Sequence, residues 1–366
     1  MRYQSASIGM ILTAVLSMAA SATVYAENSP RSDDHARRSL ATALDERSLP
    51  VLVRRSVRTP DATIASLMTS LTKVDQSLSV EKTSRESERG RVLVTGRDWR
   101  LTVFRDGSAA EFINQVAATR AHDKKAEPSR AMTFAQLQSA GRDFISRALA
   151  DTIVLGPAER LEPELTSARM EGGVAVDGTS AYSAVVANRI VFTREINGIP
   201  VVGAGSKVTI TFLNDGSVES FRYDWPQYTS TERVQATADV AEILKRVQRV
   251  AGIRTDRNFV RDSDKASAPI ELDGKATLQR LACGYYDPGV MVREAEAPVQ
   301  AGCYFHVVYT RGEGDFITHS ARSGAVPAGQ RFETDRSWPE AAALTGIDAA
   351  PAPDAAERPV PPRERQ

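Results

Sequence analysis

Two of the four histidines, His306 and His319, lie close enough in the sequence to form a site together. They flank glycine-containing residues 312–314, and a hairpin there would bring both side chains toward each other. Paired histidines can bind a metal ion or transfer protons, given a nearby carboxylate. A histidine that packs within a strand explains the same pattern. We therefore predict no catalytic residue and no metal site, and keep a hydrolase using these histidines as an alternative.

The chain has two cysteines, Cys283 and Cys303. An even number of cysteines in an exported protein favours a disulfide, which would stabilise the fold by about 3 kcal/mol in the chain-entropy model. Cys303 also lies three residues before His306, which leaves metal binding open, although no C-x-x-C pair is present. We predict the disulfide, with metal binding and free thiols as alternatives.

Motifs of common enzyme families are absent from the sequence. It has no H-E-x-x-H zinc motif, no P-loop and no nucleophile elbow with plausible partners. Two S-x-x-K strings begin at Ser70 and Ser79, but the S-D-N and K-T-G motifs of penicillin-binding enzymes do not accompany them. Glycine-rich residues 203–207 join two expected strands, so we interpret them as a hairpin loop and not as a dinucleotide site. We predict a non-enzymatic protein without a cofactor.

Residues 1–26 have the three parts of a secretory signal peptide. Arg2 supplies the positive charge, residues 8–20 form the apolar core, and Ala26 ends a small-x-small cleavage site. The core is shorter than the about 20 residues of a membrane-spanning helix, and no second apolar stretch of that length follows. An uncleaved anchor is the alternative. We predict cleavage near Ala26, a secreted or periplasmic protein, and no stable membrane span.

The charges of the chain are balanced, with 46 Lys and Arg against 46 Asp and Glu. This balance gives no electrostatic reason to expect nucleic acid or an anionic membrane as a partner. We therefore predict no nucleic-acid binding.

Helical periodicity occurs at residues 133–155 and 237–250, and more weakly at 63–78. Most of the remainder has strand patterns, at residues 91–104, 189–196, 207–213, 217–223, 276–285 and 302–310. Helices separated by several strands predict an α+β fold in which antiparallel curved sheets pack on helices.

The expected organisation has six parts. After the signal peptide, polar residues 27–48 form a flexible leader, and Pro-rich residues 346–366 form a disordered tail. Between them we expect three ordered parts: an N-terminal α+β region at 49–130, a central domain at 131–236, and a second α+β unit with the disulfide at 237–345.

An internal similarity supports this layout. LTVFRDGS at residues 101–108 aligns without gaps on ITFLNDGS at residues 210–217. Each is expected to be a strand, an Asp-Gly turn and a second extended segment, because Asp-Gly provides the positive φ of a tight hairpin. Eight positions leave duplication and independent origin both open.

Residues 190–203 read IVFTREINGIPVVG, and the pattern continues to Ser220. This segment resembles the propeptide module of thermolysin-like and fungalysin-like metalloproteases and the related PepSY domain. In that family a strand ends in a Gly-Ile-Pro-Val type turn, followed by a second strand, an Asp-Gly hairpin and a return strand. The resemblance implies two PepSY- or propeptide-like units, here without the catalytic domain that normally follows.

What the resemblance implies is binding, because such propeptides act as chaperones and inhibitors of proteases. Pairing of a strand edge with an extended peptide is the expected route. The candidate partner-binding residues are Asn197, Gly198, Ile199, Pro200 and Val201, although they would equally form a turn that holds a sheet together. We predict an exported protein-binding module, such as a protease regulator, inhibitor or chaperone, whose partner is a protein or peptide such as an exported protease. A secreted or envelope surface-interaction protein is the alternative.

Overall fold

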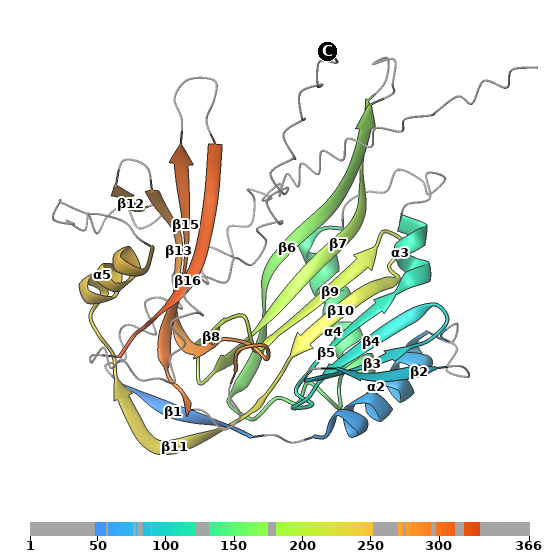
Figure 1. Cartoon of the computed structure of the whole chain (residues 1–366), viewed down its shortest axis with the longest axis horizontal. Helices are drawn as coiled ribbons and strands as arrows, with labels where there is room; N and C mark the ends of the chain where they lie inside the picture. Colours follow the sequence, from blue (N-terminus) through green and yellow to red (C-terminus); the bar gives the residue numbers. More distant parts are fainter. Residues whose placement is uncertain are drawn as a thin grey trace, which may run out of the picture.

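The computed structural model describes residues 48–55, 58–75, 78, 83–88, 90–121, 132–174, 181–251, 270–273, 276–293, 298–311 and 318–329. The expected signal peptide at 1–26, the leader apart from Ser48, and the tail at 346–366 lie outside them. The described residues form a mixed α+β fold, mostly antiparallel sheet with four helices (Figure 1). The predicted α+β class is confirmed.

The helices and strands run as follows. The helices are α2 (Pro60–Val74), α3 (Gln115–Ala121), α4 (Phe134–Ala148) and α5 (Val240–Ala251). The strands are β1 (Ser48–Arg55), β2 (Ser84–Glu88), β3 (Arg91–Thr95), β4 (Trp99–Phe104), β5 (Ala109–Asn114), β6 (Glu159–Val174), β7 (Ala181–Ile196), β8 (Ile199–Gly203), β9 (Lys207–Leu213), β10 (Val218–Asp224), β11 (Gln227–Ala236), β12 (Ile270–Asp273), β13 (Ala276–Asp287), β14 (Pro298–Val299), β15 (Ala301–Arg311) and β16 (Thr318–Pro327).

The main part of the molecule is an antiparallel sheet in the order β2-β3-β4-β5-β10-β9-β7-β6 (Figure 1). Helices α2 and α4 pack on one face, because successive side chains of a strand point to opposite faces and one set here is apolar. One register row across the sheet is fully buried against the helices and consists of Leu101, Phe112, Phe221, Ile210 and Ile190.

The two aligned segments form equivalent hairpins, as predicted from their sequences. Leu101 pairs with Phe112 in one hairpin, and Ile210 pairs with Phe221 at the same positions of the other. The hairpins meet where β5 pairs with β10, and there Phe112 lies opposite Phe221 with ring centroids 5.4 Å apart. An approximate two-fold axis therefore passes between these two rings. It relates α2 with β2–β5 to α4 with β6, β7, β9 and β10.

Both hairpin turns use the same Asp-Gly-Ser chemistry. The carboxylate of Asp106 accepts a hydrogen bond from the backbone N–H of Ser108 at 3.0 Å. Asp215 does the same for Ser217 at 2.9 Å. The intervening glycines, Gly107 and Gly216, have positive φ of 68° and 83°. Such φ values favour glycine over residues that carry a Cβ.

The third helix-and-strand unit consists of α5 and the strands in the order β12-β13-β15-β16. It joins the main sheet through β8, which pairs with β7 on one side and with β13 on the other. A separate three-stranded sheet, β11-β1-β14, lies beside it.

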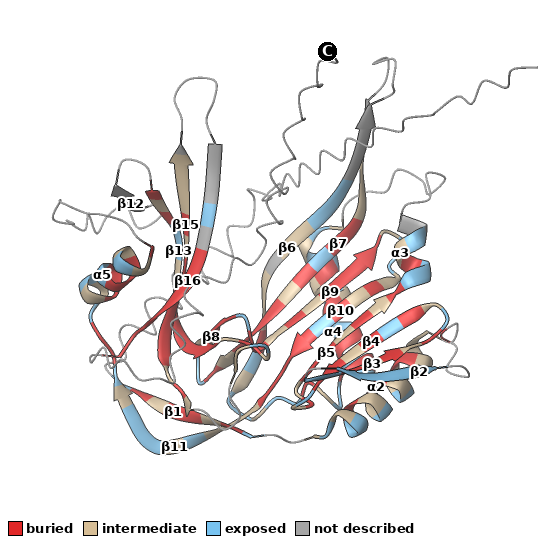
Figure 2. Cartoon of the chain, viewed as in Figure 1, coloured by how far each residue is buried: buried red, intermediate tan, exposed pale blue. Residues whose placement is uncertain are grey.

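Two large clusters of buried side chains divide the molecule differently from the expected ranges (Figure 2). The first combines residues on both sides of position 130, from Leu67 to Trp225. The second combines residues of β1 and β8 with the third unit. The regions expected at 49–130 and 131–236 therefore share one core and one sheet, because β5 pairs with β10.

Several expected boundaries were wrong for local reasons. The helix expected at 133–155 ends at Ala148, although Leu149 and Ile153 still pack into the first core. The strand expected at 91–104 is divided into β3 and β4 at Gly96, where a side chain would meet the ring of Trp99. Strand β6 was missed because its sequence is polar and glycine-containing and lacks regular alternation.

The equivalent turn glycines provide a matched test of this packing. Gly216→Ala should cost about 1–2 kcal/mol of unfolding free energy, because its left-handed φ disfavours a Cβ but nothing lies within 4 Å of it. Gly107→Ala should cost clearly more, because its Cβ would lie 2.3 Å from the carbonyl oxygen of Arg58. Urea unfolding of both variants measures the difference. Equal losses would contradict the tight contact at Gly107.

Candidate binding surface

The predicted turn at Asn197 and Gly198 is present, with positive φ values of 54° and 78°. It closes a two-residue hairpin in which Ile196 pairs with Ile199, as an Asn-Gly sequence favours. Asn197 and Gly198 are exposed, but Ile199 and Val201 are each only 2% exposed and belong to the second core. Buried side chains of this kind are not available to a partner.

Beyond this turn, strand β8 lies between β7 and β13 in the sheet. Its first residues pair with β7, and Val201 to Gly203 pair in parallel with β13. Partner binding at residues 197–201 stays a prediction, and burial excludes the side chains of Ile199 and Val201 from such a contact. These residues connect the main sheet to the third unit, and the sheet continues on both sides of β8.

The cysteines and histidines occupy the third unit. Cys283 and Cys303 lie directly opposite each other on β13 and β15, buried, with their sulfur atoms 2.04 Å apart in a disulfide. Within the described residues, no group of three or more His, Cys, Asp or Glu side chains could hold a metal ion.

The two histidines are on neighbouring strands, but the register separates them. His306 pairs with Ser323 and His319 with Thr310, four positions further along the same ladder, which corresponds to about 13 Å. The hypothesis that His306 and His319 approach each other is therefore wrong. His306 instead hydrogen bonds through Nδ1 to the hydroxyl of Ser323 at 2.8 Å. Burial and the nearby charge of Arg280 lower the pKa of His306, which favours the neutral imidazole.

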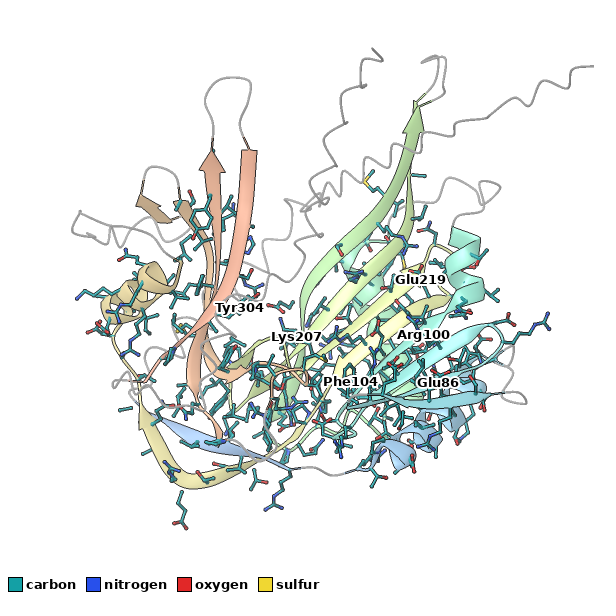
Figure 3. All side chains as sticks on the ribbon, in the orientation of Figure 1. Glu86, Arg100, Phe104, Lys207, Glu219 and Tyr304 are labelled. Atoms are coloured by element: carbon teal, nitrogen blue, oxygen red, sulfur yellow. A yellow bond between two sulfur atoms is a disulfide. The ribbon has the colours of Figure 1, made fainter. Side chains whose placement is uncertain are left out.

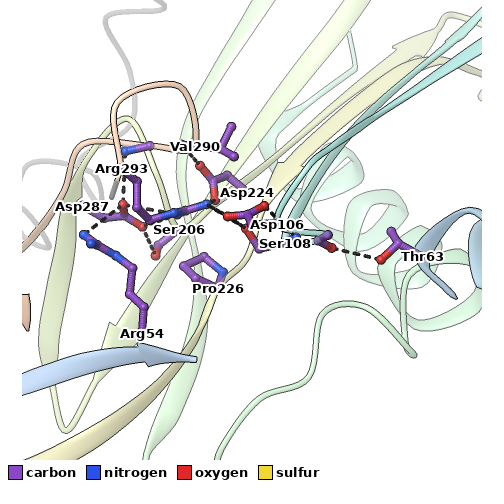
Figure 4. A network of polar contacts seen from close by, with 12 residues as sticks. Arg54, Thr63, Asp106, Ser108, Ser206, Asp224, Pro226, Asp287, Val290 and Arg293 are labelled. Atoms are coloured by element: carbon purple, nitrogen blue, oxygen red, sulfur yellow. Dashed lines mark hydrogen bonds and ion pairs between the residues drawn. The ribbon is translucent and has the colours of Figure 1, made fainter. Parts of the chain in front are cut away.

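A buried network of charged side chains joins the two cores at Arg293, in the loop after β13 (Figure 4). The guanidinium of Arg293, 2% exposed, donates to Asp224 at 2.6 Å and to Asp287 at 3.1 Å. It also donates to the hydroxyl of Ser108 at 2.7 Å, in the β4–β5 turn. Asp224 ends β10 in the main sheet, whereas Asp287 ends β13 in the third unit. One guanidinium therefore connects three elements.

Asp287 is fully buried and is surrounded by donors. Its carboxylate accepts hydrogen bonds from Tyr228 at 2.6 Å and from Ser206 at 3.0 Å, and Arg54 lies 3.6 Å away. Gly205 approaches it so closely that a Cβ there would lie 2.3 Å from the carboxylate. Residues 204–206 of this glycine-rich segment thus form a loop between β8 and β9, as expected. The hairpin prediction was wrong, because β8 and β9 do not pair with each other.

The pKa values of the two main carboxylates of this network shift in opposite directions. Burial and the negative charge of Asp287 raise the pKa of Asp224 to about 7, despite its contact with Arg293. Burial would also raise the pKa of Asp287, but Arg293, Arg54 and the hydroxyl of Tyr228 outweigh it and lower the pKa. The network is buried, and its donors and acceptors bind one another. We interpret it as a structural connection between the cores.

Removing Asp287 takes away the buried carboxylate that balances the positive charges of Arg293 and Arg54. Asp287→Ala should lower the unfolding free energy by about 3–5 kcal/mol in urea unfolding. The matched control is Asp143→Ala on α4, whose exposed ion pair with Arg147 should contribute at most about 0.5 kcal/mol. A loss below about 1 kcal/mol for Asp287→Ala would show that the network does not hold the cores together.

A second charged contact connects the main sheet to the third unit at Glu164 on β6. Lys207 lies 3.3 Å from its carboxylate, and Arg280 of β13 also forms an ion pair with it. Burial would raise the pKa of Glu164, but these two positive charges outweigh it and lower the pKa to about 2.

This lowered pKa predicts a pH dependence of stability. The folded value lies below the ordinary value of 4.5, so the contribution is complete above about pH 5 and is lost as the pH falls from 4.5 toward 2. Glu164→Gln should reduce the unfolding free energy by about 1–2 kcal/mol at neutral pH, since its partners are partly exposed. The difference from wild type should shrink at about pH 3. The control is Glu86→Gln, because Glu86 is exposed on β2. It should change the unfolding free energy by less than about 0.5 kcal/mol both at neutral pH and at about pH 3. A loss in Glu164→Gln that does not change with pH would contradict the lowered pKa of Glu164.

The face of the main sheet opposite α2 and α4 is polar and partly exposed. Arg100, labelled in Figure 3, lies on this face. One register row across it contains Arg100, Ile113, Ser220, Thr211 and Arg189. The next row contains Thr102, Glu111, Arg222, Thr209 and Val191. Helix α3 packs on one end of this face, where Ala117 contacts Ala187 and Leu213. We call these two rows the open face.

The open face was missed from the sequence, although part of its signal was visible. Residues 207–213, KVTITFL, alternate threonine with apolar residues, which predicts one buried and one exposed face. Which other strands extend that face depends on pairing between β5 and β10, more than 100 positions apart in the sequence.

Comparison with protein-family models and with the sequences of curated proteins finds no match for this chain.

In the described part of the chain, no helix is both long and apolar enough to cross a membrane.

Proposed function

We propose that this chain is an exported, non-enzymatic binding protein whose open face contacts another polypeptide. The observation that carries the proposal is the two-sided construction of the main sheet. Helices α2 and α4 bury one face, whereas hydroxyl, guanidinium and amphipathic side chains lie on the other.

The composition of the open face suits contact with a polypeptide. Threonine and serine hydroxyls donate and accept hydrogen bonds, and arginine pairs with carboxylates or backbone carbonyls. Ile113 and Val191, both partly exposed, add apolar area between these groups. Protein interfaces commonly combine such polar and apolar contacts.

The resemblance of residues 190–220 to propeptide modules makes an exported protease the first partner to test. The proposal extends to the fold: the two symmetry-related units of the main sheet are propeptide-like modules. Export itself rests on the sequence of residues 1–26. A protease-regulating role would then follow from binding, without catalytic groups in this chain.

Photo-crosslinking in the producing cell tests the proposal directly. A benzophenone side chain in place of Thr209, on the open face, should form a covalent adduct with a polypeptide. The same side chain in place of Ser146, exposed on α4 at the opposite side of the sheet, is the matched control. Mass spectrometry of the adducts identifies the partner.

A reproducible polypeptide adduct from position 209 alone is the expected result. No adduct at position 209, or the same adducts from both positions, would contradict a binding function of the open face. If the captured partner is a peptidase, its activity with and without the purified protein then decides between regulation and simple association.

A further inference from the structure

Three arginines on the open face are exposed and have no neutralising partner among the described residues. Arg100, Arg189 and Arg222 form neither a hydrogen bond nor an ion pair with another residue of the described ranges. Neighbouring charges are engaged differently: Arg169 pairs with Glu219, and Lys207 pairs with Glu164. The three guanidinium groups therefore leave uncompensated positive charge in the middle of the face.

Their spacing follows from the sheet register. Arg100 and Arg189 lie in the same row with β5, β10 and β9 between their strands, which corresponds to about 19 Å. Arg222 lies in the next row, two strands from each of them. An extended polypeptide rises about 3.3 Å per residue, so a segment of about six residues would span all three.

Two carboxylates belong to the row of Arg222. Glu111 is directly opposite Arg222 in the β5–β10 pairing, but the two form no ion pair. Glu86 ends the same row on β2, at the edge of the sheet. Three guanidinium groups against two carboxylates leave the face positive, and its centre holds only Glu111 of the two. Because the fork of an arginine matches a carboxylate with two parallel hydrogen bonds, aspartate or glutamate is the complementary group.

Resting on the binding function proposed above, we infer that the open face recognises an acidic, extended segment of its partner polypeptide. Arg100, Arg189 and Arg222 pair with carboxylates of that segment, and the partly exposed hydroxyl of Ser220 between them contacts its backbone. A single-stranded nucleic acid fits less well, since its bases stack on exposed aromatic rings. The aromatic side chain on this side of the sheet, Phe104, is buried.

Fluorescence anisotropy with a labelled poly-glutamate peptide of about twelve residues, which spans about 40 Å when extended, measures this recognition. The full-length protein should bind it, with affinity falling as salt rises. A poly-glutamine peptide of the same length is the neutral control. Polygalacturonate with a similar number of carboxylates tests an acidic polysaccharide in place of a polypeptide.

Single substitutions of the three arginines by alanine should each weaken binding of poly-glutamate by about tenfold, and the triple variant should show none. Arg147→Ala, an exposed arginine on α4 at the other side of the sheet, should bind as the wild type does. Thermal melting at the wild-type temperature establishes that each variant remains folded. If the triple variant does not fold, the single variants still test the inference.

Wild-type affinity in the triple variant, equal loss in Arg147→Ala, or equal binding of poly-glutamine would overturn the inference. Equal or tighter binding of polygalacturonate would overturn the assignment to a polypeptide. The two experiments distinguish failure of this inference from failure of the proposed binding function. If position 209 crosslinks to a partner but the protein does not bind poly-glutamate, the binding function holds and only the preference for acidic segments is wrong.

Discussion

The contact between Arg293 and the two aspartates, Asp224 and Asp287, is the constraint on which the arrangement of the two cores depends. Each aspartate ends a strand of a different unit, and both are buried, so neither can be satisfied by water. A buried charge without a partner is costly, so the two strand ends must remain together. Gly205 packs directly against Asp287, and a side chain at position 205 would occupy the space of the carboxylate. A glycine at this position therefore lets Asp287 reach its partners.

Because the contact at Arg293 holds the two strand ends together, the sheet continues from β7 through β8 into β13. Pairing changes from antiparallel to parallel at β8, and the second core stays buried. The turn at Asn197 and Gly198 begins this connection, so residues 197–201 have a structural role in this fold. This turn and the surface proposed for binding are therefore different parts of the molecule. The turn at Asn197 and Gly198 connects the main sheet to the third unit, whereas the open face lies on β4, β5, β10, β9 and β7.

The approximate two-fold arrangement explains why the main sheet has such different faces. Two helix-plus-strand units join at Phe112 and Phe221, and both place their helix on the same side. The apolar rows then form one continuous core, and the alternating rows form one continuous polar face. Residues that are unremarkable in each unit, such as Arg100 and Arg189, become members of the same row only after the units pair.

The local features of this protein could be predicted from the sequence: the α+β class, the Asp-Gly and Asn-Gly turns, and the strand at residues 207–213 follow from side-chain chemistry within a few residues. The meeting of β5 with β10, the separation of His306 from His319, and the interior position of β8 could not. They depend on the register between segments distant in the chain, and a change of one residue in register would reverse which side chains are buried. Tertiary structure alone therefore decided which polar residues share the open face and which charges are buried at Arg293.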